Sequence, residues 1–291
     1  MLSLGHQRWL HTNLVAKSFS NVTDPFEVKF DIKTPTLNFD FNSAADYTAK
    51  LIADKYVNLH VCLSGGLDSE FVAAVLLRNG IPFVPVIVPT LSSSESWFAF
   101  KFCHENKLTP IVFDFSNKTK SGDSEFVMDN LITKACRIAT ALKVPIEESL
   151  IPNIVVELLL DPTAKMLTGY GEPFPNHKHF HQPLGNTMEL SDHDYYLNLE
   201  YDDLHPGSFF TYTPEIFKAM VKDIDTTANV QIAKAKLYGL PERCKSYSFF
   251  ESSKSIMGLR SHHIHELYKK FWRDEHLRNV NIDRQTLLSM L

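Results

Sequence analysis

A short polar segment, Ser64–Ser69 (SGGLDS), lies between two apolar runs of the sequence. Its two glycines would let the backbone turn sharply and approach a ligand without Cβ clashes. A helix that follows it would offer free N–H groups and the positive end of its dipole to an anion. The serine hydroxyls add donors, and the carboxylate of Asp68 is a ligand for the magnesium that accompanies a polyphosphate. The segment predicts a phosphate site; the alternative is a plain turn with Asp68 as a helix cap.

The elements around this segment alternate between apolar strands and helices. This alternation predicts an α/β fold with a parallel sheet and helices on both of its faces. Ligands of such sheets bind beyond the carboxyl ends of the strands, which is where Ser64 and Thr168 would lie. The expected strands are 60–64, 83–88, 110–115 and 164–169, and the expected helices are 67–78, 92–107, 124–142 and 145–160.

Three regions are expected along the chain. Residues 1–56 would form an N-terminal arm, with short strands at 26–32 and 37–41 and a helix at 43–56 capped by Ser43. Residues 57–170 would form the α/β core. Residues 171–291 would form an active-site loop over 172–207 and a helical extension packed on the core. The helices of that extension are expected at 214–222, 226–238 and 261–275.

The composition narrows the classes of protein and of partner to expect. The balance is mildly acidic, with 34 Asp and Glu against 29 Lys and Arg, which disfavours a nucleic-acid partner without excluding one. The four cysteines form no C-x-x-C pair, so we expect neither a zinc ribbon nor a disulfide framework, and a reducing, cytoplasmic setting. No apolar run is long enough to span a membrane. Residues 1–23 lack acidic side chains, and a transit peptide is the lesser reading of that segment.

The segment S-G-G-L-D-S resembles, at every fixed position, the S-G-G-x-D-S signature of the PP-loop, or N-type, ATP pyrophosphatases. It is neither a Walker loop, because no Gly-Lys-Ser/Thr follows, nor the three-glycine dinucleotide fingerprint. The resemblance implies an adenine nucleotide alpha hydrolase-like fold, with a parallel sheet and flanking helices. Members of this superfamily cleave ATP between the α and β phosphates. They adenylate an oxygen of the substrate and release pyrophosphate.

Two further segments resemble one branch of that superfamily. Residues 166–174 (MLTGYGEPF) look like the L-T-G-E-G-x-D-E stretch of asparagine synthetases and β-lactam synthetases. Residues 240–247 (LPERCKSY) look like their L-P-x-R-x-K-x-F stretch. The order and approximate spacing of the three segments agree with the synthetase domain of these enzymes.

Carried over position by position, the resemblance implies a set of contacts with ATP and Mg²⁺. The pyrophosphate half of ATP would be cradled by Ser64, Gly65, Gly66, Asp68 and Ser69. The backbones of Leu63 and Val88 would touch the adenosine. Thr168 and Gly169 would lie beside the α-phosphate, and Asp68 would hold the magnesium. Lys245 would neutralise the departing pyrophosphate, an electrostatic role of the kind that is worth several kcal/mol in a dry site, and Arg243 would assist it.

The chain also departs from that pattern. Tyr170 stands where these enzymes have a glutamate implicated in activating the amine, and tyrosine is a poor base at neutral pH. Pro173 replaces their aspartate, and Glu172 is shifted by one position. The glutamine-using members begin with a catalytic cysteine, whereas position 2 here is Leu2. We therefore expect free ammonia, an amine on the substrate or a partner glutaminase to supply the nitrogen.

The sequence leaves further roles open. His177, His179 and His181 lie in a segment that we expect to loop over the active site, where they would bind a metal, contact the substrate or do neither. The function expected is that of an ATP-dependent ligase. It would adenylate a carboxylate on a small molecule and then form an amide with an amine or ammonia. The alternatives are adenylation of a nucleobase carbonyl and a nucleotide-binding module without catalysis. The sequence does not fix the oligomeric state, and a homo-oligomer stays open.

Overall fold

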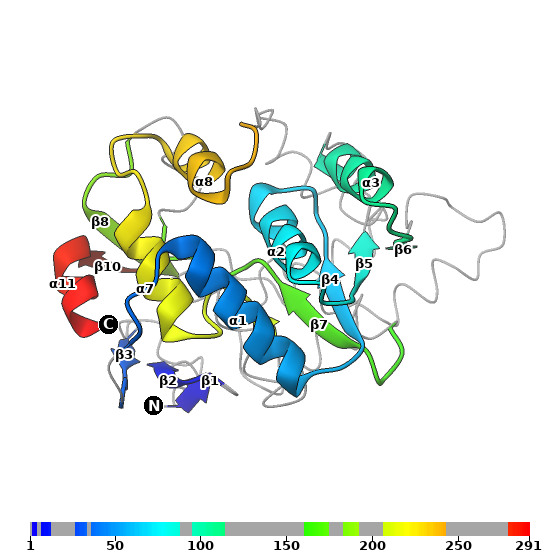
Figure 1. Cartoon of the computed structure of the whole chain (residues 1–291). Coiled ribbons are helices and arrows are strands. Elements are labelled where there is room, and N and C mark those ends of the chain that lie inside the picture. Colours follow the sequence, from blue (N-terminus) through cyan, green and yellow to red (C-terminus); the bar gives the residue numbers. More distant parts are fainter. Residues whose placement is uncertain are drawn as a thin grey trace, which may run out of the picture.

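A computed structural model of the chain describes residues 2–4, 7–12, 27–33, 36–87, 95–113, 160–174, 183–191, 206–242 and 279–291. Its centre is a five-stranded sheet in the order β6-β5-β4-β7-β9, and every neighbouring pair is parallel (Figure 1). The predicted α/β fold with a parallel sheet is therefore confirmed. The strands are β4 (Leu59–Cys62), β5 (Val84–Ile87), β6 (Ile111–Val112), β7 (Lys165–Thr168) and β9 (Gly207–Ser208).

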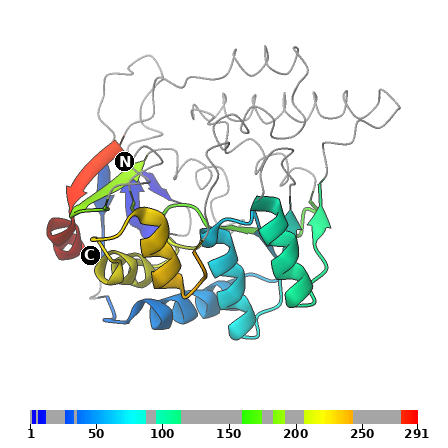
Figure 2. The same ribbon diagram turned by 90° about the horizontal axis from the view of Figure 1, so that it is seen from above.

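The strand order creates a topological switch point at β4. The chain passes from β4 through α2 (Leu67–Arg78) to β5 on one side, and β7 pairs with β4 on the other side. Figure 2 shows α1 (Phe41–Lys55), α2 and α3 (Glu95–Glu105) on the same side of the sheet. The helices predicted for 124–142 and 145–160 lie outside the described residues. In sheets of this kind the crevice beyond such a switch point is the ligand-binding position, and here the loops after β4 and β7 meet there.

Two smaller sheets accompany the central one. The first joins β1 (Leu2–Leu4), β2 (Gln7–Thr12) and β3 (Val28–Phe30) in antiparallel order. The second pairs β8 (Thr187–Ser191) with β10 (Asn279–Asp283), far apart in the sequence. Helices α7 (Pro214–Asp223), α8 (Val230–Tyr238) and α11 (Arg284–Met290) complete the described elements. One continuous apolar core extends from Trp9 to Leu291.

Several predicted boundaries are wrong. Residues 37–41 were expected to form a strand, but 36–40 are irregular and α1 already begins at Phe41. Asp40, not Ser43, caps this helix, because its carboxylate accepts the N–H of Ser43 at 2.9 Å. The local alternation of apolar and polar residues imitated a strand, but the ring of Phe41 is instead buried in a stack of aromatic side chains.

After β7, the described residues form strands as well as helices. The expected loop over 172–207 contains β8, whose partner β10 follows about ninety residues later, so only tertiary pairing reveals either strand. The helix expected at 226–238 begins at Val230, because Asn229 accepts two N–H groups of the first turn. The helix expected at 261–275 lies outside the described residues. No helix among the described residues is long and apolar enough to cross a membrane.

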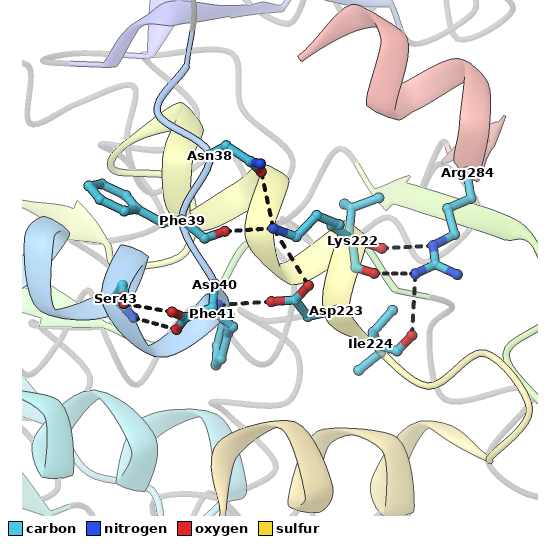
Figure 3. Close-up of polar contacts among 10 residues, drawn as sticks. Asn38, Phe39, Asp40, Phe41, Ser43, Lys222, Asp223, Ile224 and Arg284 are labelled. Carbon is cyan, nitrogen blue, oxygen red and sulfur yellow. Dashed lines mark hydrogen bonds and ion pairs between the residues drawn. The ribbon is translucent and has the colours of Figure 1, made fainter.

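A polar cluster fastens the C-terminal elements to the rest of the fold (Figure 3). The guanidinium of Arg284 donates to the carbonyl oxygens of Val221, at 2.8 Å, and of Lys222 at the end of α7. The ammonium of Lys222 donates to the carbonyl of Phe39 at 2.6 Å. The carboxylate of Asp223 accepts the first N–H of α1, that of Phe41, at 2.9 Å. Arg284 therefore satisfies carbonyls that the end of a helix leaves without partners.

We expect Arg284→Ala to lower the free energy of unfolding by about 1–3 kcal/mol, because the carbonyls at the end of α7 lose a charged donor. Chemical denaturation of the wild type and the variant measures this difference. Lys236→Ala is the control, since the Lys236 side chain is 70% exposed and its pair with Asp225 is worth little. Equal midpoints for Arg284→Ala and the wild type would show that the cluster contributes nothing.

Cys103 is buried in α3, and burial raises the pKa of its thiol to about 11. Because the thiolate is the reactive form, we expect Cys103 in the native protein to react with iodoacetamide at mildly alkaline pH at least about tenfold more slowly than the same residue in denaturant. Peptide mapping by mass spectrometry after timed quenching gives both rates. Equal rates in the two states would contradict burial of this thiol.

Candidate active site

The loop between β4 and α2 is held together by its own serines. The hydroxyl of Ser69 accepts the N–H of Ser64 and donates to the carbonyl of Gly66, both at 3.2 Å. The two serine hydroxyls lie 3.1 Å apart, and that of Ser64 also accepts the N–H of Gly66 at 3.2 Å. Gly65 has a φ of 89°, in the region that favours glycine. The serines therefore fix the shape of the loop, in addition to any contact with a ligand that the sequence predicted for them.

Gly66 is a glycine that the fold itself does not require. Its φ of −73° and ψ of 161° are open to any residue, and of the described residues an added Cβ would meet only Ser64, whose hydroxyl oxygen would lie 3.4 Å away. Gly66 is also the N-cap of α2, and no side chain caps the first turn. Among the described residues other than its chain neighbours, nothing but the Ser64 hydroxyl lies within 4 Å of the space that a methyl group at Gly66 would take, which suits close contact between this backbone and a phosphate.

Gly169 brings the end of β7 directly against this loop. A Cβ at Gly169 would lie 2.9 Å from the carbonyl carbon of Asp68 and from the nitrogen of Ser69, both backbone atoms. Only glycine permits this close approach, so packing against the loop explains a glycine here, and the contact of Gly169 with the α-phosphate stays a prediction. The approach also carries the next residues of the chain, including Glu172, to the first turn of α2.

A buried lysine joins the two loops. The ammonium of Lys234, on α8, lies 3.1 Å from both carboxylate oxygens of Asp68 and forms a close ion pair with Glu172. The Lys234 side chain is 7% exposed, whereas those of Asp68 and Glu172 are 25% and 20% exposed. Asp68 and Glu172, both predicted site residues, therefore hold one cation between them. Lys234 was not predicted, although its position four residues after Val230 and four before Tyr238 places it on one face of the helix.

The charges of this cluster keep Lys234 protonated. Burial alone would lower the pKa of the lysine, but the carboxylates of Asp68 and Glu172, through their charges and hydrogen bonds, raise it above its ordinary value. Two carboxylates and one ammonium leave the cluster with one net negative charge. The two carboxylates are therefore suited to bind a cation of higher charge than the ammonium, or a ligand that carries such a cation.

Tyr238 supports Asp68 from the same face of α8. Its hydroxyl donates to a carboxylate oxygen of Asp68 at 2.7 Å. Burial, followed by the charges of Asp68 and Glu172, raises the pKa of this phenol well above its ordinary value, so it remains a donor. Its ring stacks on those of Phe71, Phe41 and Phe210, at centroid distances of 4.5, 5.7 and 5.8 Å. The aromatic core therefore fixes the orientation of Asp68.

The ends of α8 are set by its sequence, and this places Lys234 and Tyr238 one turn apart at the site. Asn229 accepts the N–H groups of Gln231 and Ile232 at 3.1 Å each, which starts the helix. Gly239, with a φ of 66°, ends it directly after Tyr238 in the left-handed conformation typical of helix C-termini.

The carboxylates of Asp68 and Glu172 are of the type that binds magnesium, but the ammonium of Lys234 lies between them. Magnesium on a nucleotide is bound by one or two carboxylates together with phosphate oxygens and water, and Asp68 and Glu172 supply such a pair. The ammonium between them is already a cation bound by both side chains. Within the described ranges no three His, Cys, Asp or Glu side chains form a metal-binding group. The described carboxylates would therefore hold the ion only together with a ligand such as a polyphosphate.

The remaining predicted residues lie around this cluster or outside the described ranges. Leu63 is buried, and its N–H donates to the carbonyl of Val86 at 2.8 Å, which continues the pairing of β4 with β5 up to the loop. Thr168 is buried at the end of β7, and the carbonyl of Tyr170 accepts the hydroxyl of Ser208. The predicted residues outside the described part of the chain are Val88, His177, His179, His181, Arg243 and Lys245.

Comparisons with known proteins add little to this geometry. No protein-family model matches the chain, and no curated protein matches it. Among solved structures, the NMN synthetase from Francisella tularensis is similar to this chain over 78% of its length and 96% of the synthetase, with 12% identity and a TM-score of 0.30.

Proposed function

We propose that the protein is an ATP-dependent ligase that activates a carboxylate as its adenylate, releases pyrophosphate and then forms an amide. The observation that carries the proposal is the cluster of Asp68, Glu172 and Lys234 at the open N-terminus of α2. It combines first-turn N–H groups that no side chain caps, two carboxylates that would bind Mg²⁺ and a cation that would bind phosphate oxygens. It lies at the switch point of the sheet, where α/β folds bind ligands.

Each part of the site has a task in this reaction. The first-turn N–H groups of α2 and the backbone at Gly66 would hold the β- and γ-phosphates. Asp68 and Glu172 would hold Mg²⁺, which when bound neutralises charge on the phosphates. Lys234 adds a positive charge beside them. By resemblance, Lys245 and Arg243 would face the leaving pyrophosphate.

The proposed chemistry has two steps. In the first, a carboxylate oxygen attacks the α-phosphorus, and the bond from that phosphorus to the bridging oxygen breaks as pyrophosphate leaves. In the second, the nitrogen lone pair attacks the activated carbonyl carbon, AMP departs with the electron pair of the carbon–oxygen bond, and the nitrogen loses a proton. Of the two residues at or near the position of the family's glutamate, Glu172 rather than Tyr170 would accept that proton, through the carboxylate oxygen that does not bind Mg²⁺, because a phenol is a poor base at neutral pH.

The structure also bears on the alternative of a module without catalysis. That alternative rested on the loss of the acidic pair at Tyr170 and Pro173. The carboxylate of Glu172 nevertheless reaches the same cation as Asp68. The shift by one position therefore keeps a second acidic group at the site, which supports a catalytic function.

The test is product analysis with Mg-ATP and pooled carboxylic acids and amines. The proposal predicts AMP and pyrophosphate in equal amounts, dependent on both an acid and an amine. Formation of ADP and phosphate would contradict it. Tight ATP binding with no turnover in any pool would favour the binding module, and turnover that requires nucleic acid would favour a nucleobase substrate.

A further inference from the structure

The ammonium of Lys234 occupies the position that a metal ion would take between Asp68 and Glu172. It contacts both oxygens of Asp68 and one oxygen of Glu172. Its side chain is nearly buried, whereas the side chains of Asp68 and Glu172 are 25% and 20% exposed. Both acidic side chains are thus partly accessible to solvent, whereas the lysine that they share is not.

A magnesium ion and this ammonium cannot share the position. Magnesium binds carboxylate oxygens at about 2.0–2.1 Å, so an ion held by both side chains would lie within a few ångströms of the lysine nitrogen. At that separation the repulsion between a divalent and a monovalent cation is large in a partly buried site. Entry of the metal therefore requires the ammonium to move away from at least one carboxylate.

A polyphosphate supplies new hydrogen-bond acceptors for the displaced ammonium. Lysine has a flexible stem of four carbons, so its charge can move by several ångströms while α8 stays in place. Phosphate oxygens at the N-terminus of α2 would accept it, whereas a free metal ion brings no acceptor. Leaving the ammonium buried without a partner is costly, so free metal is disfavoured relative to metal that arrives on a polyphosphate.

We propose that Lys234 is an internal counter-ion that closes the Asp68–Glu172 site to free Mg²⁺ and opens it to Mg²⁺ bound to a polyphosphate. This rests on the proposed function only in taking the ligand to be a metal polyphosphate. The lysine holds the two carboxylates in place until the ligand arrives and then binds its phosphate oxygens. Lys234 thereby determines specificity for the metal complex over the metal alone.

The test measures binding of free Mn²⁺, as a probe for Mg²⁺, to the full chain by electron paramagnetic resonance. We expect Lys234→Met to bind free Mn²⁺ at least about tenfold more tightly than the wild type, because the competing cation is gone. Lys236→Met, on the exposed face of the same helix, is expected to match the wild type. Equal Mn²⁺ affinity in Lys234→Met and the wild type, whether tight or weak, overturns the proposal.

A second measurement needs no variant and remains decisive if Lys234→Met fails to fold. Wild-type protein is titrated with Mn²⁺, with inorganic tripolyphosphate and with both. Because Mn²⁺ and tripolyphosphate also bind each other in solution, the third titrant is their preformed complex; the proposal predicts synergy, with this complex binding at least about tenfold more tightly than either component alone. Independent binding, or tight binding of free Mn²⁺, overturns it.

Failure of this inference and failure of the ligase proposal give different results. Synergy without any AMP formation would leave the role of Lys234 standing and contradict the ligase. AMP formation with equal Mn²⁺ affinity in the wild type and Lys234→Met would contradict the role of Lys234 alone.

Discussion

Gly66→Ala is expected to lower the affinity for Mg-ATP at least about thirtyfold while the free energy of unfolding stays within about 1 kcal/mol of the wild type. The backbone at Gly66 suits alanine, and the new Cβ would have one ordinary contact, with Ser64. Alanine stabilises the folded protein by reducing the entropy of the unfolded chain, and it destabilises it by a similar amount because alanine is a poorer N-cap than glycine. The methyl group would instead fill the space beside the N-terminus of α2 that a phosphate needs.

Calorimetric titration with Mg-ATP and chemical denaturation test the two halves of this prediction. Lys236→Met is the control for ATP affinity, since its side chain lies on the exposed face of α8. Unchanged ATP affinity in a stable Gly66→Ala protein would contradict phosphate binding at this loop. Unfolding of the variant would instead show that the contact with Ser64 is tighter than its 3.4 Å indicates.

Asp68→Asn is expected to reduce the rate of AMP formation at least about a hundredfold. Asparagine has nearly the shape of aspartate, and its carbonyl oxygen can still accept the hydroxyl of Tyr238. The change removes one of the two negative charges that would hold Mg²⁺, while Glu172 keeps its pair with Lys234. The loss is therefore expected in catalysis and metal dependence more than in folding.

The rate of AMP formation is measured in single turnovers at saturating Mg-ATP. The acid and the amine are those identified in the pooled assay. Asp46→Asn is the matched control, because it removes a carboxylate that pairs with Arg78 on the surface, away from the site. A rate for Asp68→Asn within about twofold of the wild type would show that Asp68 has no role in the reaction.

The sequence was informative where a local pattern carries the structure. The loop Ser64–Ser69 and helix α2 lie where the pattern predicts, because strand, glycines and helix are adjacent in the chain. The period-two pattern at 37–41 was misleading, since packing of Phe41 against Phe71 and Tyr238 outweighed a weak local preference. The strands β8 and β10 depend on a pairing between distant segments, which no local pattern indicates.

In the candidate site, too, the residues within local motifs could be predicted, and those placed by tertiary packing could not. Asp68 and Glu172 lie in or beside motifs with recognisable spacing, and the structure brings them to one cation. Lys234 and Tyr238 belong to no motif, and they reach the site because α8 packs against α2. One signal in the sequence could have indicated Lys234. It lies four residues from both Val230 and Tyr238, on a helix face that is otherwise apolar. Buried charges of this kind require a partner, so the lysine itself indicated a nearby carboxylate.

The most direct measurement is calorimetric titration of Mg-α,β-methylene-ATP, which cannot be cleaved between the α and β phosphates, into wild type, Gly66→Ala and Asp68→Asn. A phosphate and magnesium site at the N-terminus of α2 predicts one binding event in the wild type, weakened at least about tenfold in each variant. No binding to the wild type, or equal affinity in all three proteins, would contradict that site.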